Sequence, residues 1–162
     1  SDQQPHGVIW TMSLEQWLQN DWLQRHEPSL AEIHQLLQVV DREISDAQAT
    51  GLSADGRFEH SYDAALQLCV IALHAQGYRV TKGKSHHEYG IDSLRFTLGL
   101  NWSKTADYID RCRRLRSQIV YQRIGVVSGE SADELLETAN QLRSDVLSWL
   151  RNHHPPLVPP NY

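Results

Sequence analysis

The residue of this chain with the clearest capacity for chemistry is Arg116, in the basic stretch from Ser103 to Ile124. At about 100° per residue this stretch forms an amphipathic helix, and Arg116 falls near the centre of its apolar stripe. A guanidinium does not lose its charge near neutral pH, so on a packed surface it needs a negative partner. A core carboxylate, a second subunit or a bound anion could each meet this need.

Arg116 could stabilise the negative charge that builds up on phosphorus during metal-free RNA cleavage. Such cleavage also needs a group that moves a proton near neutral pH, usually a histidine. Five residues further on stands Tyr121, whose ordinary pKa of about 10 suits it better to stacking or hydrogen bonding than to base catalysis. The alternative is structural: Arg116 pairs with an acid such as Asp63 or Glu59 and fixes the register of two helices.

The basic residues are concentrated in one part of the chain. Residues 79 to 124 hold ten of the fifteen Lys and Arg but four of the twenty acids, so this segment carries +6 and the remainder −11. A chain polarised in this way can offer one attractive face to a phosphate backbone, or its basic and acidic helices can neutralise each other by packing side by side. The candidate contacts to RNA or a nucleotide are Arg57, Lys82, Lys84, His87, Arg113 and Arg114.

Other kinds of site find little support in the residue spacing. His86 and His87 are adjacent and point about 100° apart on a helix, and the sequence has no HxxxH or HExxH pair, so we predict no metal and no cofactor. Cys69 and Cys112 lie on apolar helical faces without CxxC spacing and are interpreted as buried hydrophobic residues. Neither a long apolar span nor a signal-peptide pattern is visible, so we expect a cytoplasmic protein with no membrane partner.

Helix-start signals organise the rest of the chain. A serine followed three residues later by Glu or Gln, the capping box, occurs at residues 13–16, 29–32, 85–88 and 131–134. Together with the helical spacing of apolar residues, these signals predict an all-α, up-and-down bundle of five to six helices. The expected helices span about residues 13–26, 29–50, 53–76, 85–98, 103–124 and 131–152.

A length of 162 residues and 40% apolar content are those of one globular domain with an ordinary core. We therefore expect a single helical-bundle domain over residues 1–152, with a Trp-rich N-terminal helix at about 13–26 and a core at about 29–152. The proline-rich residues 153–162 are expected to form an extended tail.

Three segments of the chain share their helix order and scattered positions with a known family. They are residues 57–66, the Gly77–Tyr78 turn with His86 and His87, and Arg116 to Tyr121 followed by residues 131–142 and 149–150. Over about residues 53–152 the chain resembles HEPN-domain proteins, a helical family of prokaryotic toxin–antitoxin and defence systems that also occurs beside minimal nucleotidyltransferases. The resemblance implies a homodimer in which two copies of an R-x4-6-H motif meet in an RNA-cleaving cleft.

The motif itself departs from that pattern in this chain. Arg116 falls on the motif arginine, whereas Ser117 stands where Asn is frequent and Tyr121 stands where His would be. We therefore expect a HEPN-like protein with a degenerate nuclease motif that binds RNA or a nucleotide at a basic cleft of a homodimer. Arg116 and Tyr121 are the candidate catalytic pair, and a nucleotidyltransferase or an antitoxin is the expected partner.

Two alternatives stay open. One is a metal-independent endoribonuclease toxin that uses Arg116 with Tyr121 or His87. The other is a non-catalytic protein-interaction module in which the Trp-rich N-terminal helix binds a partner. Loss of intact RNA on incubation with the protein would indicate the first. Partner capture that disappears on removal of residues 1–26 would indicate the second.

Overall fold

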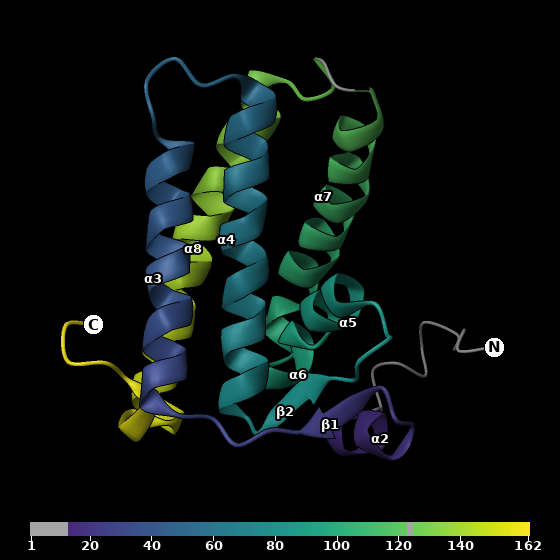
Figure 1. Ribbon diagram of the computed structural model, residues 1–162, viewed down its shortest axis with the longest axis vertical. Coiled ribbons are helices and arrows are strands. Elements are labelled where there is room, and N and C mark those ends of the chain that lie inside the picture. Colours follow the sequence, from purple (N-terminus) through teal and green to yellow (C-terminus); the bar gives the residue numbers. More distant parts are fainter. Residues whose placement is uncertain (1–12, 123–124) are drawn as a thin grey trace.

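Four long helices that alternate in direction form the body of the molecule (Figure 1). The structure is a computed structural model that describes residues 13–122 and 125–162. The long helices are α3 (Leu30–Ala47), α4 (Ala54–Ala75), α7 (Ser103–Gln122) and α8 (Gly129–His153). The chain is therefore mostly helical, in agreement with the predicted all-α class. Residues 123 and 124, the last two of the expected basic helix, lie outside the described residues.

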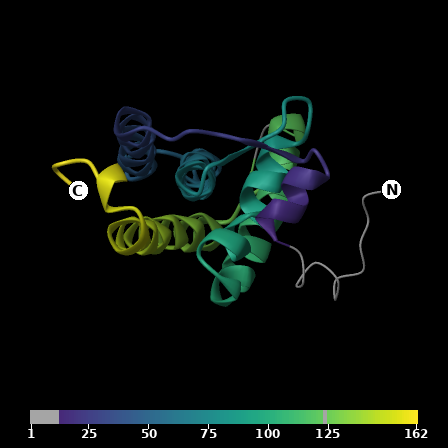
Figure 2. The same cartoon turned by 90° about the horizontal axis from the view of Figure 1, so that it is seen from below.

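Helix α4 lies at the centre of the bundle. Viewed from below in Figure 2, it is surrounded by α3, α8 and the segment that contains α7. More than half of its residues are buried, including Ala64, Ala65, Ala72 and Ala75, whose small side chains allow neighbouring helices to approach closely. Cys69 on the same helix and Cys112 on α7 are buried and free, in agreement with their interpretation as small hydrophobic residues.

The expected helix over residues 13–26 is wrong in extent. It is the short helix α2 (Leu14–Gln19), after which Asp21 adopts a φ of +62° and turns the chain into the strand β1 (Leu23–Arg25). This strand pairs antiparallel with β2 (Tyr78–Val80), Leu23 lying opposite Val80. Trp17 and Trp22 pack edge to face and, with Tyr89 and Phe96, form a second small core. The indoles therefore hold the sheet against the bundle.

The expected fourth helix, residues 85–98, is divided in the structure. It consists of α5 (His86–Asp92) and α6 (Leu94–Thr97), and a 3-10 turn, Leu100–Trp102, connects it to α7. Only one of the four predicted capping boxes forms completely. Ser13 forms a complete box with Gln16, and Ser29 caps α3 through the amide of Glu32. Ser85 makes no such hydrogen bond, and α8 starts earlier than predicted because Ser128 caps it.

The predicted extended tail instead folds back on the bundle. Pro155–Leu157 form a 3-10 turn, and Leu157, Val158 and Tyr162 pack against the main core. The Tyr162 hydroxyl donates a hydrogen bond of 2.6 Å to Asp41 on α3. These contacts give the proline-rich end a fixed position. Among the described helices, none combines the length and hydropathy that a bilayer span requires.

Candidate functional site

Arg116 lies in the middle of α7 and faces α4, as its place in the apolar stripe predicted. Its guanidinium carbon lies 5.4 Å from the centre of the Tyr62 ring, which is within the range of a cation–π contact. Its nearest carboxylate is that of Asp63, one of the two acids predicted, but the N to O distance is 4.0 Å. This is too long for a hydrogen bond, so Arg116 and Asp63 form an ion pair without one.

One nitrogen of Arg116 is not satisfied by the fold. Its Nε is buried and has no hydrogen-bond partner among the residues that the structure describes. The side chain as a whole is 32% exposed, so the rest of the guanidinium reaches solvent. A buried donor without a partner costs free energy, and an acceptor from outside can reach only the exposed part of the guanidinium. The guanidinium therefore has unused capacity to bind an anion.

Tyr62 links Arg116 to a histidine from another helix. The ring of Tyr62 is fully buried, and its hydroxyl shares a hydrogen bond of 2.9 Å with Nδ1 of His87, in the first turn of α5. Burial raises the pKa of Tyr62, so the phenol stays protonated. Burial, together with the guanidiniums of Arg116 and Arg113, lowers the pKa of His87. A neutral imidazole therefore lies beside two cations.

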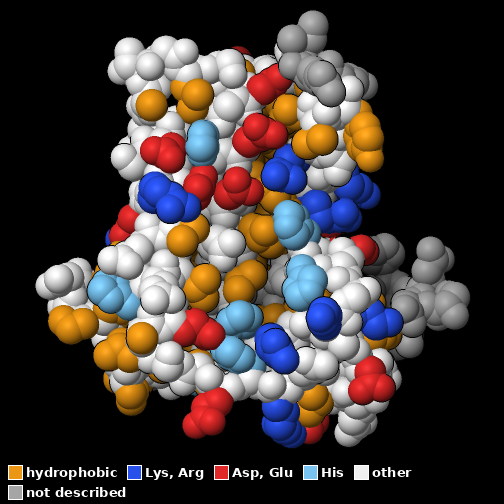
Figure 3. Space-filling view, viewed as in Figure 1, with side chains coloured by type: hydrophobic (Ala, Val, Ile, Leu, Met, Phe, Trp, Pro, Cys, Tyr) orange, Lys and Arg blue, Asp and Glu red, His pale blue; other side chains and the backbone are white. Residues whose placement is uncertain are grey.

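The charges around this cluster are divided between two sides. Burial raises the pKa of Asp63, with Glu43 and Glu59 adding to the effect and Arg116 opposing it. On the other side, Arg113 contacts Asp110 through Nε at 2.8 Å. Figure 3 shows the same division: Lys and Arg side chains gather along α7, while acidic side chains lie over α3 and α4. An anion would therefore approach Arg116 from the side of α5 and α7.

The structure brings together three of the residues predicted from the sequence: Arg116, Arg113 and His87, which share the surroundings of Tyr62. Arg114 lies on the same helix but is mostly exposed, 3.8 Å from Asp110. Tyr121 is 85% exposed at the end of α7, because a separation of five residues turns its side chain about 140° away from Arg116.

The remaining predicted contacts lie elsewhere. Arg57, at the start of α4, forms an ion pair with Asp133 of α8. Lys82 and Lys84 are exposed in the turn that precedes α5. These three side chains do not join the Arg116 cluster in the folded chain. They could contact only a more extended part of a long ligand such as RNA.

Tyr62 is the member of the cluster that sequence reasoning missed. Tyr62 lies on the apolar face of the central helix, so the sequence pattern indicated only a core residue there. The hydroxyl of Tyr62 is the feature that could have indicated its role. A buried tyrosine needs a hydrogen-bond partner for its hydroxyl, whereas a buried phenylalanine needs none. His87 provides that partner.

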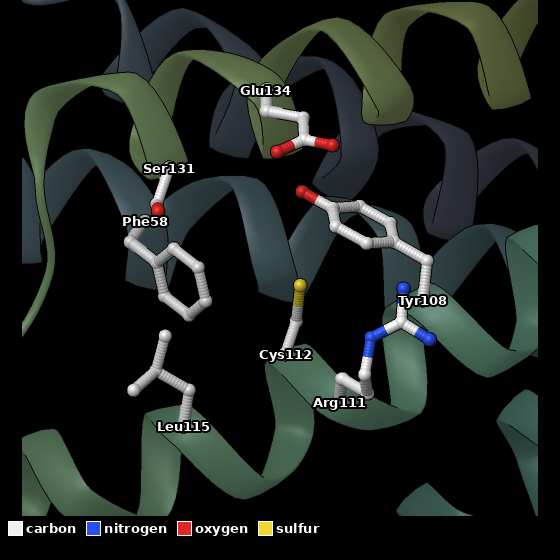
Figure 4. Close-up of a pocket in the computed structure, with 7 residues that line it drawn as sticks. All are labelled: Phe58, Tyr108, Arg111, Cys112, Leu115, Ser131 and Glu134. Carbon is white, nitrogen blue, oxygen red and sulfur yellow. The ribbon is translucent and has the colours of Figure 1, made fainter.

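A small cavity of about 120 Å³ opens on another side of α7, between α4 and α8 (Figure 4). It is lined by Phe58, Tyr108, Arg111, Cys112, Leu115, Ser131 and Glu134. In Figure 4 the Tyr108 hydroxyl points toward the Glu134 carboxylate. The volume is well below the roughly 300 Å³ at which pockets for small molecules begin, so we do not place a nucleotide there.

No family model, no curated protein and no solved structure matches the chain. The resemblance to HEPN-domain proteins therefore remains a prediction from the sequence. The geometry around Arg116, Tyr62 and His87 is the basis on which a function can be proposed.

Proposed function

We propose that this chain is a HEPN-like protein with a degenerate nuclease motif that binds RNA or a nucleotide through a phosphate at Arg116. The observation that carries this proposal is a guanidinium that is 32% exposed and lies 4.0 Å from the Asp63 carboxylate, with an Nε that has no hydrogen-bond partner in the described part of the chain. A purely structural arginine at a helix interface has its donors satisfied by acceptors of the fold. Arg116 has capacity left for an external acceptor.

A phosphate fits this arrangement in charge and in shape. A guanidinium presents a planar fork of donors that matches two phosphate oxygens, and here its carbon lies 5.4 Å from the centre of the Tyr62 ring. Arg113, whose Nε donates to Asp110, brings a second guanidinium from the adjacent turn of α7. The imidazole of His87 can donate or accept a further hydrogen bond. Together these groups define one phosphate position between α5 and α7.

Self-association through α7 is part of the proposal, as is a role in a prokaryotic toxin–antitoxin, defence or stress system with a nucleotidyltransferase or antitoxin partner. The self-association is supported by two apolar side chains at the end of α7: Val120 is 55% exposed and Tyr121 is 85% exposed. A second copy could cover both side chains. Light scattering tests this part: we expect a mass of two chains for the wild type and of one chain for Val120→Asp. A wild type that stays monomeric at high micromolar concentration would rule out the homodimer.

Binding is tested by fluorescence anisotropy with two probes, a labelled single-stranded RNA and a labelled nucleoside triphosphate. We expect Arg116→Ala to weaken binding about tenfold, a typical effect of losing one charge-assisted contact of about 1.4 kcal/mol. Arg151→Ala is the matched control, because it removes the same charge from an exposed position at the far end of α8. Equal affinities for wild type and Arg116→Ala would reject the site, and the stronger of the two probes identifies the ligand class.

An endoribonuclease is the second candidate, and the contact between Tyr62 and His87 favours it. If Nδ1–H of His87 donates to the Tyr62 oxygen, Nε2 is unprotonated and can take the proton of a ribose 2′-hydroxyl. That oxygen would then form a bond to phosphorus while the P–O5′ bond breaks, which gives a 2′,3′-cyclic phosphate; the 5′-oxygen would take a proton from water, and Arg116 would stabilise the charge on the phosphoryl oxygens. Tyr121 is not required in this scheme.

A quenched fluorescent RNA substrate separates binding from cleavage. The enzyme hypothesis predicts a rise in fluorescence that both His87→Gln and Arg116→Ala abolish, in chelator-containing buffer. No signal from a wild type that binds the same RNA would leave binding as the function. The third possibility, a protein-interaction module based on the N-terminal tryptophans, is less favoured because Trp17 and Trp22 are buried within the fold.

A further inference from the structure

The end of β1, the start of α3 and the end of α4 lie at the lower end of the bundle in Figure 1. Two imidazoles and one carboxylate from these three segments lie close together. His26 directly follows β1, Glu32 lies in the first turn of α3 and His74 lies in the last turn of α4. One ligand atom from each residue lies within 4.8 Å of the other two. This cluster contains none of the residues of the Arg116 site.

The distances inside the cluster are close to those around a metal ion. Nε2 of His26 lies 2.8 Å from both oxygens of Glu32, and Nδ1 of His74 lies 3.4 Å from the nearer one. The centres of the two imidazole rings are 4.5 Å apart. Around a tetrahedral zinc ion with bonds of about 2.0–2.1 Å, ligand atoms are separated by about 3.3–3.4 Å. The Glu32 oxygen and Nδ1 of His74 already have this spacing. Nε2 of His26 would have to move about half an ångström away from the Glu32 carboxylate.

Hydrogen bonding alone leaves this cluster incomplete. The contact between His74 and Glu32 lacks hydrogen-bond geometry, and the buried Nδ1 of His74 has no other partner in the described part of the chain. Glu32 also does not complete the capping box that its position predicts. Ser29 caps its amide, but its side chain bonds His26 instead of returning to the helix start. The carboxylate is therefore held between two histidines.

The backbone holds both histidines in place around a single glycine. Gly77 ends α4 with a φ of +94°, and its amide donates to the carbonyl of His74 while its carbonyl accepts from the amide of His26. The ladder between β1 and β2 continues from this point. A site built on such paired backbone segments needs little reorganisation to receive an ion.

We infer that His26, Glu32 and His74 form a binding site for a divalent first-row transition metal such as zinc. Two imidazoles and one carboxylate are a ligand set that such metals accept, and hard ions such as Mg²⁺ prefer oxygen alone. The three side chains are 20%, 30% and 21% exposed, so the cluster is partly open to solvent. Figure 3 shows histidine side chains reaching the surface below α4. The site joins β1, α3 and α4 and leaves at least one position for an exchangeable ligand.

A second cluster of Glu43, Asp46 and His60 serves as an internal comparison. It offers a single imidazole, and His60 is already bonded to Glu43 at 2.7 Å. Asp46 is exposed and faces water, so this cluster resembles an ordinary surface ion pair. We expect no comparable affinity there, which makes His60→Ala a control that removes one histidine of the chain without touching the proposed site.

The test uses the untagged full chain after treatment with a chelator. Titration with Co²⁺, followed by its visible absorption and then by displacement with Zn²⁺, is expected to show one site per chain. His26→Ala and Glu32→Gln should each weaken binding at least about tenfold, whereas His60→Ala should bind as the wild type does. Zn²⁺ should also raise the melting temperature of the wild type and not that of His26→Ala.

Two results would overturn the inference: no binding of Co²⁺ or Zn²⁺ by the wild type at millimolar concentration, or equal affinity of the wild type and His26→Ala. His26 follows a strand at the surface, so circular dichroism should show that His26→Ala folds even if His74→Ala does not. Arg116→Ala should keep full metal affinity. Failure of the RNA-binding proposal and failure of the metal site can therefore be distinguished.

Discussion

Two arginines of this chain face the interior from neighbouring helices and differ in how the fold receives them. Arg95, on α6, is 5% exposed and donates to the carboxylates of Asp92 and Asp107 at 2.8 and 2.9 Å. It also donates to the backbone carbonyl of Asp92. Arg116, on α7, lies over an aromatic ring, 4.0 Å from one carboxylate, with a buried Nε that has no partner among the described residues.

The comparison separates a cation that holds the fold together from one that is available for a ligand. Arg95 links the end of α5 to the start of α7 and is surrounded by acceptors. Arg116 is surrounded by a ring, a neutral imidazole and a carboxylate whose pKa is raised by burial. If this distinction is correct, substitutions at the two arginines should affect different measurements.

The largest effect on stability is expected for Arg95→Ala. Removing a buried guanidinium leaves two carboxylates without their partner, and Asp92 is already held at a raised pKa by burial. Both acids are partly exposed, so the expected loss in the free energy of unfolding is about 2–3 kcal/mol, below the range for fully buried pairs. Urea denaturation measures it. A loss under about 0.5 kcal/mol would remove the contrast between the two arginines.

Arg116→Ala should affect RNA affinity more than stability. We expect a change of less than about 0.5 kcal/mol in the free energy of unfolding, because its contact with Asp63 is long and partly exposed. The affinity for RNA should fall, and the slope of log affinity against log salt should decrease by about one. Arg116→Lys sharpens the result: it keeps the charge and the salt slope but loses the planar fork above Tyr62. A large destabilisation by Arg116→Ala would make this arginine structural.

Tyr62→Phe tests the link between Arg116 and His87. The substitution keeps the buried ring but removes the hydroxyl that bonds Nδ1 of His87. We expect a loss of about 1 kcal/mol in the free energy of unfolding, the usual value for one hydrogen bond. RNA affinity should change little, since the ring still supports the guanidinium. Thermal or urea unfolding together with the anisotropy assay measures both quantities, and a strong loss of affinity would show that the hydroxyl itself contacts the ligand.

The contrast also shows how far the sequence could lead. The helices α3, α4, α7 and α8 were predictable because their apolar residues follow the helical period over many turns. The strands β1 and β2 have three residues each, which is too short for an alternating pattern to be recognised, so the first was predicted as helix. Ser85 matched a capping box without forming one, since two residues of a motif do not determine the local backbone.

The candidate site was predictable in part for the same reason. Arg116 stood out because a charge in an apolar stripe is a local property of one helix, and Asp63 was one of the acids expected to meet it. The hydrogen bond between Tyr62 and His87 depends on how α5 packs against α4, which no spacing within either segment encodes. The cluster of His26, Glu32 and His74 was invisible for the same reason, because its residues come from three elements and form no metal-binding motif.

The smallest effect is expected in the titration of His87. Burial and the guanidiniums of Arg116 and Arg113 lower the pKa of His87 in the folded state. As the pH falls through the ordinary histidine range, the unfolded chain therefore binds a proton at this residue before the folded chain does. Stability should therefore decrease as the pH falls through about 6.5, where the unfolded chain takes up its proton first. His74 and His154, whose pKa values are also lowered by burial, add to this slope.

Nuclear magnetic resonance of the histidine ring protons separates these contributions. In Arg116→Ala the pKa of His87 should rise toward its ordinary value, because one of the two nearby cations is gone, and the pH dependence of stability should become shallower. Arg151→Ala should leave both unchanged, since Arg151 lies at the far end of α8. If the pKa of His87 is the same in all three proteins, Arg116 does not act on this imidazole, and the two groups cannot be parts of one anion-binding site.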